Sequence, residues 1–197
     1  MNLKSRHFVC VFLINAVLGT STSAVGFVGA IVDDATGKPI AARVYVQNAN
    51  SGEFLFVETD SDDGSALPYR EQWVPMENSI ERHTTVSAHP FRVDLAPGRY
   101  SLIVERGKEY STFVREVTIA VGDSTRRETV RLKRWANMAA RGWYSGETHV
   151  HRRIPELPNV MLAEDLNVAV PVTFWTTNAY EAPHLKPSTL RSQGPSP

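Results

Sequence analysis

Short segments that favour β-strands alternate with clusters of turn-forming residues from residue 27 to residue 132, and this pattern constrains the fold more than any other feature. In one segment Val44 and Val46 lie on one face, and Arg43 and Tyr45 lie on the other. Alternation of this kind between turns is typical of an antiparallel β-sandwich or barrel, so the sequence predicts a mainly β chain. The expected strands span residues 27–33, 41–47, 53–59, 90–95, 100–105, 113–120 and 125–132.

Residues 65–88 interrupt the pattern. They contain Pro68, Pro75 and scattered charges, and their apolar residues follow no clear period. We therefore expect a long insertion between strands, and loops of this length are uncommon unless they are functional or mobile. His83 and His89 lie in or beside this segment without ligand spacing, so we expect both at the surface.

The first 24 residues have the three-part organisation of a secretory signal peptide. A basic start with Lys4 and Arg6 precedes an apolar run over residues 8–19 and a run of small residues ending at Ala24. The apolar run is shorter than the ~20 residues that a membrane-spanning helix needs, so we expect cleavage and no stable membrane anchor. Cleavage would also remove Cys10, the one cysteine in the chain. These features predict an exported protein, periplasmic or secreted, without disulfides.

Composition excludes some partners. The chain has 21 Lys and Arg residues against 21 Asp and Glu residues, a formal net charge of zero. Proteins that bind nucleic acid or anionic membranes by charge carry a basic excess, which this chain lacks. Apolar residues make up 42% of the chain, enough for a sizeable core.

The order of motifs in the first half resembles the carboxypeptidase regulatory-like domain, a transthyretin-like β-sandwich often fused to secreted proteins. Its most specific parts are the Thr-Gly-x-Pro hairpin at residues 36–39 and the Pro-Gly-x-Tyr turn at residues 97–100. The resemblance covers residues 27–133 and implies a domain over residues 25–134, with the 65–88 insertion as a departure. In that family the domain is non-catalytic: it aids folding, spaces other domains or binds neighbouring surfaces.

A second motif follows a connector that begins near residue 133. Residues 142–151 read Gly-Trp-Tyr-Ser-Gly-Glu-Thr-His-Val-His. On a regular strand Glu147, His149 and His151 would share one face, because side chains alternate with period two. Imidazole and carboxylate groups suit zinc or manganese, so the sequence predicts a divalent metal site here. Two surface histidines beside a strand end remain the alternative.

A strand–loop–helix–strand order surrounds this motif. We expect a loop over residues 152–158, a helix capped by Asn159 that runs to about Leu166, and a strand over residues 168–175. This order indicates a parallel pair of strands, so the fold class is an antiparallel β-sandwich followed by a short, incomplete βαβ segment over residues 135–180. Residues 181–197 have no periodicity and are expected to be a disordered tail.

Residues 142 to about 180 resemble the start of the PHP superfamily, the polymerase and histidinol phosphatase family, and most closely its metallohydrolase branch. His149 and His151 match the family's first motif, and Glu147 stands near its usual acidic residue. The resemblance implies metal-dependent hydrolysis of an ester, amide or phosphoester, with Glu147 as a third ligand or a hydrogen-bond partner. The chain departs from the family at Thr173-Phe174-Trp175, where the family has Thr-Asp-His, and the later motifs have no counterpart.

These patterns leave two functions open. In the first, an exported non-catalytic β-sandwich is fused to the truncated front of a metal-dependent hydrolase-like domain that is expected to be inactive as written. A small-molecule substrate is expected only if that domain is complete, and the catalytic residues remain unknown. In the second, the protein is an extracellular binding or spacer module whose partner is a surface protein or polysaccharide. His184, the last histidine, lies in the predicted tail and is not expected to bind metal.

Overall fold

The computed structural model describes residues 24–72 and 80–172. Almost all of the predicted signal peptide, the tail and Thr173-Phe174-Trp175 lie outside these residues. The strands are β1 Val25–Asp33, β2 Ala42–Asn48, β3 Phe54–Leu55, β4 Glu58–Thr59, β5 Ala66–Gln72, β6 Ile80–Val86, β7 Phe91–Leu95, β8 Gly98–Glu105, β9 Phe113–Ile119, β10 Arg126–Leu132, β11 Gly146–Val150 and β12 Val168–Pro171. The helices are the 3-10 turns η2 Ala139–Arg141 and η3 Ile154–Glu156, and the α-helix α1 Leu157–Ala163.

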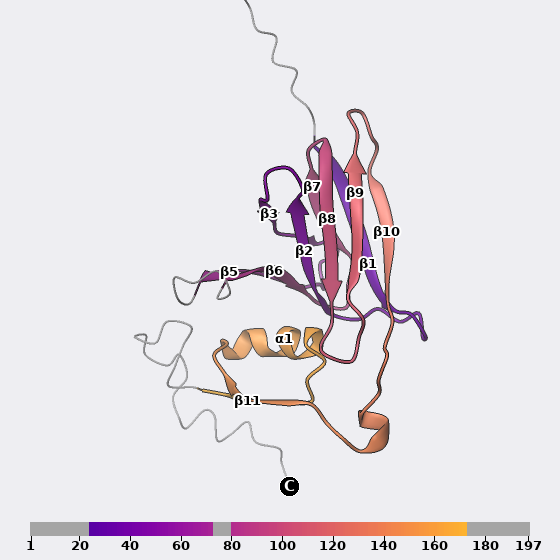
Figure 1. Ribbon diagram of the computed structural model, residues 1–197. Helices are drawn as coiled ribbons and strands as arrows, with labels where there is room; N and C mark the ends of the chain where they lie inside the picture. Colours follow the sequence, from indigo (N-terminus) through magenta and orange to yellow (C-terminus); the bar gives the residue numbers. More distant parts are fainter. Residues whose placement is uncertain (1–23, 73–79, 173–197) are drawn as a thin grey trace, which may run out of the picture.

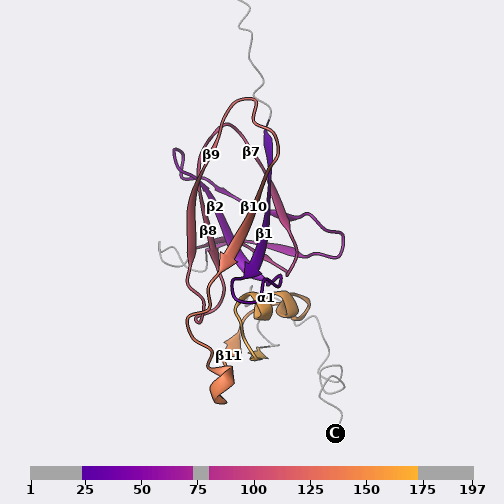
Figure 2. The ribbon, with the colours of Figure 1, turned by 90° about the vertical axis from the view of Figure 1, so that its right-hand side faces the viewer.

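Two sheets face each other in the first half of the chain, as Figures 1 and 2 show. One has the strand order β10-β1-β7-β4, and the other has the order β5-β6-β2-β8-β9 with β3 paired to β2. The predicted mainly β sandwich is therefore confirmed. One pairing differs from the antiparallel expectation, because β1 and β10 run parallel in a register from Phe27↔Arg126 to Asp33↔Leu132.

Alternation of side chains builds the core between the sheets. Along β1 every second residue from Val25 to Asp33 is buried. The facing strands contribute the remaining side chains, each of which stabilises the fold by about 1.5–3 kcal/mol through burial of apolar surface. Tyr100 is also buried, and its hydroxyl donates to the carbonyl of Ala96 over 2.9 Å, which closes the predicted Pro-Gly-x-Tyr turn. The largest fully buried apolar side chains are Phe27, Phe91, Leu95, Leu102, Leu132, Val44, Val86, Val104, Val117 and Val130.

The structure of residues 65–88 differs from the long irregular loop that the sequence predicts between strands. β5 and β6 form an antiparallel hairpin in register from Ala66↔Val86 to Gln72↔Ile80, and they extend the second sheet. Pro68 is tolerated because β5 is the edge strand, where a missing N–H costs no ladder hydrogen bond on the open side. Thr84 and Thr85 are fully buried. Because these polar residues occupy core positions, the segment lacks the alternation of apolar residues from which a strand is predicted. Thr84 Oγ1 accepts a hydrogen bond from the N–H of Val57, which satisfies it.

The expected strand over residues 53–59 divides between the two sheets. β3 pairs with β2 in the second sheet, whereas β4 pairs with β7 in the first. The chain thus crosses the sandwich at Phe56 and Val57, and Val57 is buried at the crossing.

The second half forms the expected strand–helix–strand unit, which we call the βα unit (residues 145–172). β11 and β12 pair in parallel, and α1 lies between β11 and the β5–β6 hairpin and contacts β6 (Figure 1). The helix begins at Leu157, earlier than the predicted Asn159, because Pro155 and Pro158 occupy first-turn positions where a missing N–H does not matter. It is followed by Asp165, whose φ of 54° turns the chain toward β12.

Asn159 does not cap the helix. Its side chain is buried, and Nδ2 donates to the carbonyl of Thr85 in β6 over 3.1 Å and to Ser65 at longer distance. The residue therefore fastens α1 to the sandwich, a role that only the folded chain reveals. Among residues 24–72 and 80–172, no helix has both the length and the apolar composition to cross a bilayer.

Candidate metal site

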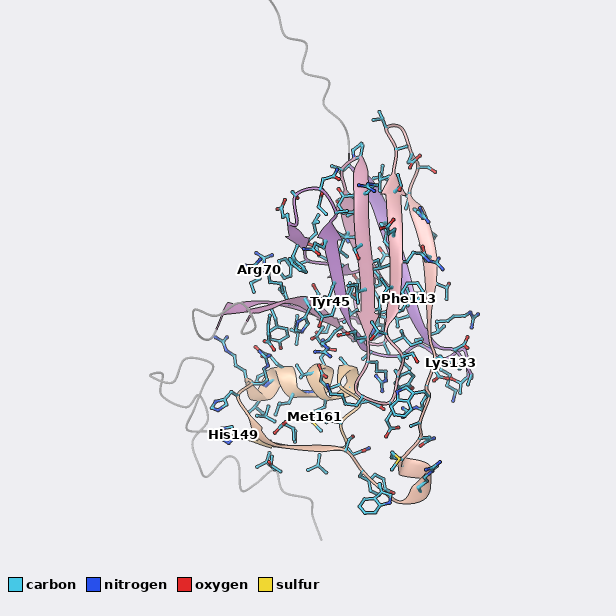
Figure 3. All side chains as sticks on the ribbon, viewed as in Figure 1. Tyr45, Arg70, Phe113, Lys133, His149 and Met161 are labelled. Carbon is cyan, nitrogen blue, oxygen red and sulfur yellow. The ribbon has the colours of Figure 1, made fainter. Side chains whose placement is uncertain are left out.

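His149 and His151 lie where β11 ends. His149 is the fourth residue of the strand, Val150 is its buried last residue, and His151 follows it. Figure 3 shows His149 at the left-hand end of β11, on the side of the β5–β6 hairpin. β11 is paired in parallel with β12, so the two histidines stand at the carboxyl end of a parallel pair, the edge at which ligand sites of α/β units gather.

The two imidazoles are close enough to bind one ion. Their Nε2 atoms are 2.9 Å apart, and the ring centroids are 4.7 Å apart with the planes inclined by 61°. With metal–nitrogen bonds of about 2.0–2.1 Å, this separation corresponds to an angle of about 90° at the ion, and tetrahedral zinc would need about 3.3 Å. A movement of a few tenths of an ångström accommodates either geometry, so the donor pair fits a divalent ion.

Glu147 does not join the pair in this structure. β11 carries a bulge between Glu147 and Val150, because these residues pair with Ala169 and Pro171 and so three steps on β11 oppose two on β12. The extra residue breaks the alternation that would place Glu147 on the face of the histidines. Its carboxylate turns back instead, and Oε1 accepts the N–H of His149 over 3.0 Å. Within residues 24–72 and 80–172, no three His, Cys, Asp or Glu side chains gather as a metal site.

The expectation of a surface His83 is wrong. Its ring is buried between Tyr45 and Tyr69, at centroid distances of 5.3 and 5.2 Å. Burial, together with the positive charge of Arg43, lowers the pKa of His83 to about 4, so the imidazole is neutral at pH 7. His89 is half-buried, and its Nδ1 lies 2.9 Å from Ser87 Oγ. His184 lies outside the described residues.

An arginine clamp, formed by Arg106 and Arg134 on the carboxylate of Asp165, fixes the βα unit on the sandwich. Arg106 Nη2 donates to Oδ1 over 2.6 Å, and Arg134 Nη2 donates to Oδ2 over 2.8 Å. Both guanidinium groups also lie against the ring of Tyr110, whose hydroxyl donates to buried Asp33 over 3.1 Å. The clamp thereby links Asp165 to the core of the sandwich.

The clamp is connected to β11 through the backbone of Asp165. Ser145 Oγ donates to the carbonyl of Asp165 over 2.7 Å, and the N–H of Ser145 donates to Asn167 Oδ1 over 3.1 Å. Ser145 immediately precedes β11, so the start of the histidine-bearing strand is held by the same turn that the arginines hold. The sequence contains no local signal for this arrangement, because its partners are separated by 20 to 59 residues.

A second set of contacts supports the other end of the unit. Arg152, which follows His151, forms an ion pair with Glu81 over 2.5 Å, and its guanidinium lies 4.1 Å from the ring centroid of Tyr69. The hydroxyl of Tyr69 donates to Glu156 Oε2 over 3.2 Å. The chain on both sides of the histidine pair is therefore anchored to the sandwich.

Comparisons with known proteins do not assign the chain to a family. Neither a protein-family model nor a curated protein matches the chain. Among solved structures, the chain is similar to that of a streptococcal ancillary pilin, at 18% sequence identity and a TM-score of 0.36. The match covers 57% of this chain but only 30% of the pilin, so the chain spans less than a third of that protein's length.

Proposed function

We propose that this protein is an exported, metal-binding module in which a non-catalytic β-sandwich supports a βα unit like the front of a PHP-type metallohydrolase. His149 and His151 are the proposed ligands of a divalent zinc or manganese ion. The observation that carries the proposal is the 2.9 Å separation of their Nε2 atoms at the carboxyl end of a parallel strand pair.

The donor set suits such an ion. Two neutral imidazoles favour zinc or manganese over calcium and magnesium, which prefer oxygen ligands. A bound ion of this kind lowers the pKa of a water molecule and so supplies a nucleophile for hydrolysis. The chain's own contribution is to place the two histidines. Glu147 accepts a hydrogen bond from the N–H of His149 within the bulge between Glu147 and Val150, and so fixes the backbone there. We assign Glu147 as a hydrogen-bond partner or further ligand.

The sandwich has a supporting role in this proposal. The arginine clamp, the Asn159 bond to Thr85 and the Arg152–Glu81 pair attach the βα unit at three places. A two-stranded sheet with one short helix is too small to be stable alone, since isolated pairs of strands are marginal in water. The sandwich therefore supplies the stability that keeps the histidines in place.

A binding or spacer module without a metal is the second candidate function. It is favoured by the small donor set, because the described residues bring only two metal-ligating side chains together at this site. In that case the histidines hydrogen-bond to each other, with one neutral ring donating and the other accepting.

Zinc titration distinguishes the two candidates. We expect the wild-type protein to bind zinc, and we expect His149→Ala and His151→Ala each to weaken binding at least tenfold while circular dichroism stays unchanged. His89→Ala is the matched control, because His89 is also partly exposed and has no second imidazole beside it. Equal zinc affinity in the wild type and in the double variant His149→Ala/His151→Ala would refute the ligand assignment and favour the spacer module.

A further inference from the structure

A groove lies at one edge of the β-sandwich, beside the place where the chain crosses from one sheet to the other. β4 and β5 are the outermost strands of the two sheets at this edge. The groove is lined by residues 53–56 and Glu58 around the crossing, and by Arg92, Val93 and Asp94 of β7. Its volume of about 370 Å³ lies within the range of about 300–1,000 Å³ that is typical of ligand pockets.

Arg70 of β5 also lines the groove, and its position is fixed by an aromatic ring. The centre of its guanidinium group lies 4.0 Å from the ring centroid of Phe56. A second cavity of about 420 Å³ shares Phe56, Glu58 and Arg70 with the first and continues along β5. Figure 3 shows Arg70 above the β5–β6 hairpin, whereas α1 and His149 lie below it. The groove is therefore on the face of the hairpin that is turned away from the βα unit.

Charges of both signs line the groove. Arg70 and Arg92 contribute guanidinium groups, and Glu53, Glu58 and Asp94 contribute carboxylates. Arg92 Nη2 donates to Glu58 Oε2 over 2.9 Å, but these side chains are 57% and 74% exposed, and exposed ion pairs contribute little to stability. A ligand that carries charge of one sign would be repelled by one of the two sets.

A neutral ligand with several hydroxyl groups can use both sets. A hydroxyl group donates one hydrogen bond and accepts others, whereas a carboxylate only accepts and a guanidinium group only donates. The guanidinium fork of an arginine also reaches two neighbouring oxygens at once. Leu55 and Val93 line the same groove and offer apolar surface to the C–H groups of a sugar ring. Carbohydrates carry both kinds of group on one ring, so they match this lining.

We propose that this groove binds a neutral polysaccharide. Arg70 donates to sugar hydroxyls, Asp94 accepts from them, and Phe56 holds the Arg70 guanidinium in place by stacking. A polymer is favoured over a single sugar, because a third cavity of about 460 Å³ shares Arg92 with the groove and is lined by residues 59–62. The proposal goes beyond the metal site and needs no metal ion, since the groove and the histidine pair share no residue.

Isothermal titration calorimetry of the full-length protein with soluble polysaccharides tests the proposal. The probes are three neutral polymers, starch, arabinoxylan and hydroxyethyl cellulose, and one anionic polymer, polygalacturonate. We expect the protein to bind at least one neutral polymer and not to bind polygalacturonate. Arg70→Ala should weaken binding at least tenfold, and Asp94→Ala should weaken it severalfold, with circular dichroism unchanged. Arg99→Ala is the matched control and should bind like the wild type, because Arg99 is exposed on β8 and does not line the groove.

The outcomes also separate the groove from the metal site. Absence of binding to all three neutral polymers, or equal affinity in the wild type and in Arg70→Ala/Asp94→Ala, would overturn the proposal. Binding to polygalacturonate alone would overturn the neutral ligand and indicate an anion site at Arg70. The variant His149→Ala/His151→Ala should bind the polymer as the wild type does, and Arg70→Ala should bind zinc as the wild type does. A wild type that binds the polymer but no zinc would therefore refute the metal site alone.

Discussion

Arg106 Nη2 donates to Oδ1 of Asp165 over 2.6 Å, and this ion pair joins the β-sandwich to the βα unit across 59 residues of sequence. The side chains are 11% and 19% exposed, so water screens the pair only in part. Arg134 binds the second oxygen, which satisfies both carboxylate oxygens with charged donors. Charge-assisted bonds of this kind are roughly twice as strong as neutral ones.

Substitution Asp165→Asn should weaken attachment of the βα unit. Asn tolerates the left-handed φ of 54° about as well as Asp does, so the substitution removes the charge without backbone strain. We expect a loss of about 1–3 kcal/mol in the free energy of unfolding, measured by urea denaturation, because two guanidinium groups lose their counter-ion.

Asp34→Asn is the control for this substitution. Asp34 also lies near an arginine, Arg131, but the atoms are 4.0 Å apart and both side chains are about half exposed. Exposed pairs contribute about 0–1 kcal/mol, so this variant should stay near wild type. Equal losses in the two variants would show that the clamp contributes no more than a surface pair.

His83 should make the protein less stable in mild acid. Its pKa is about 4 in the folded chain and about 6.5 when unfolded, so between these values the unfolded chain binds one proton more. Stability therefore falls as the pH drops from about 6.5 to about 4, by about 3 kcal/mol in total, and falls no further through this group below that range. Denaturant titrations at pH 7 and pH 5 measure the change.

His83→Phe separates this effect from other titrating groups. Phe fits between Tyr45 and Tyr69 as a flat ring of similar size and carries no proton. We expect the variant to lose much less stability than the wild type between pH 7 and pH 5. The same pH dependence in both proteins would show that His83 is not the responsible group.

Much of the sandwich could be predicted because local alternation reports burial directly. The segments around Val44 and Phe91 show this, since their apolar side chains face the core with period two. The β5–β6 hairpin could not be predicted, because its buried residues Thr84 and Thr85 are polar. Their hydrogen bonds go to Val57 and Asn159, which are far away in the sequence. The parallel pairing of β1 with β10 was equally hidden, since strand order depends on contacts between distant residues.

The candidate site was predictable only in part. The His-x-His pattern indicated that His149 and His151 share a face, and the structure brings their Nε2 atoms together. The bulge that removes Glu147 from this face depends on how β11 is paired with β12, which alternation within one strand does not reveal. The clamp on Asp165 likewise joins residues with no fixed spacing in sequence.

Gly29→Ala should destabilise the sandwich. A Cβ at Gly29 would overlap the ring of Phe91, which is fully buried opposite it on β7. Overpacking of a core costs about 1–3 kcal/mol, because the ring or the backbone must move. Gly26→Ala on the same strand is the control, since its Cβ would meet Thr125 at an ordinary 3.5 Å. A thermal unfolding midpoint equally lowered in both variants would contradict this account of Gly29.

Gly107→Ala should separate the βα unit from the sandwich while the sandwich stays folded. A Cβ at Gly107 would lie 2.5 Å from the carbonyl oxygen of Glu164 and 2.8 Å from the Cβ of Asp165, so the two parts must move apart. The φ of 47° also strains any residue with a Cβ, by roughly 1–2 kcal/mol. Gly122→Ala isolates this strain, because Gly122 has a φ of 84° and open space around it.

Hydrogen exchange of the α1 amides should accelerate in Gly107→Ala and not in Gly122→Ala, while exchange in β1 and β8 changes equally in both. If α1 exchanged alike in the two variants, close contact at Gly107 would not hold the βα unit in place.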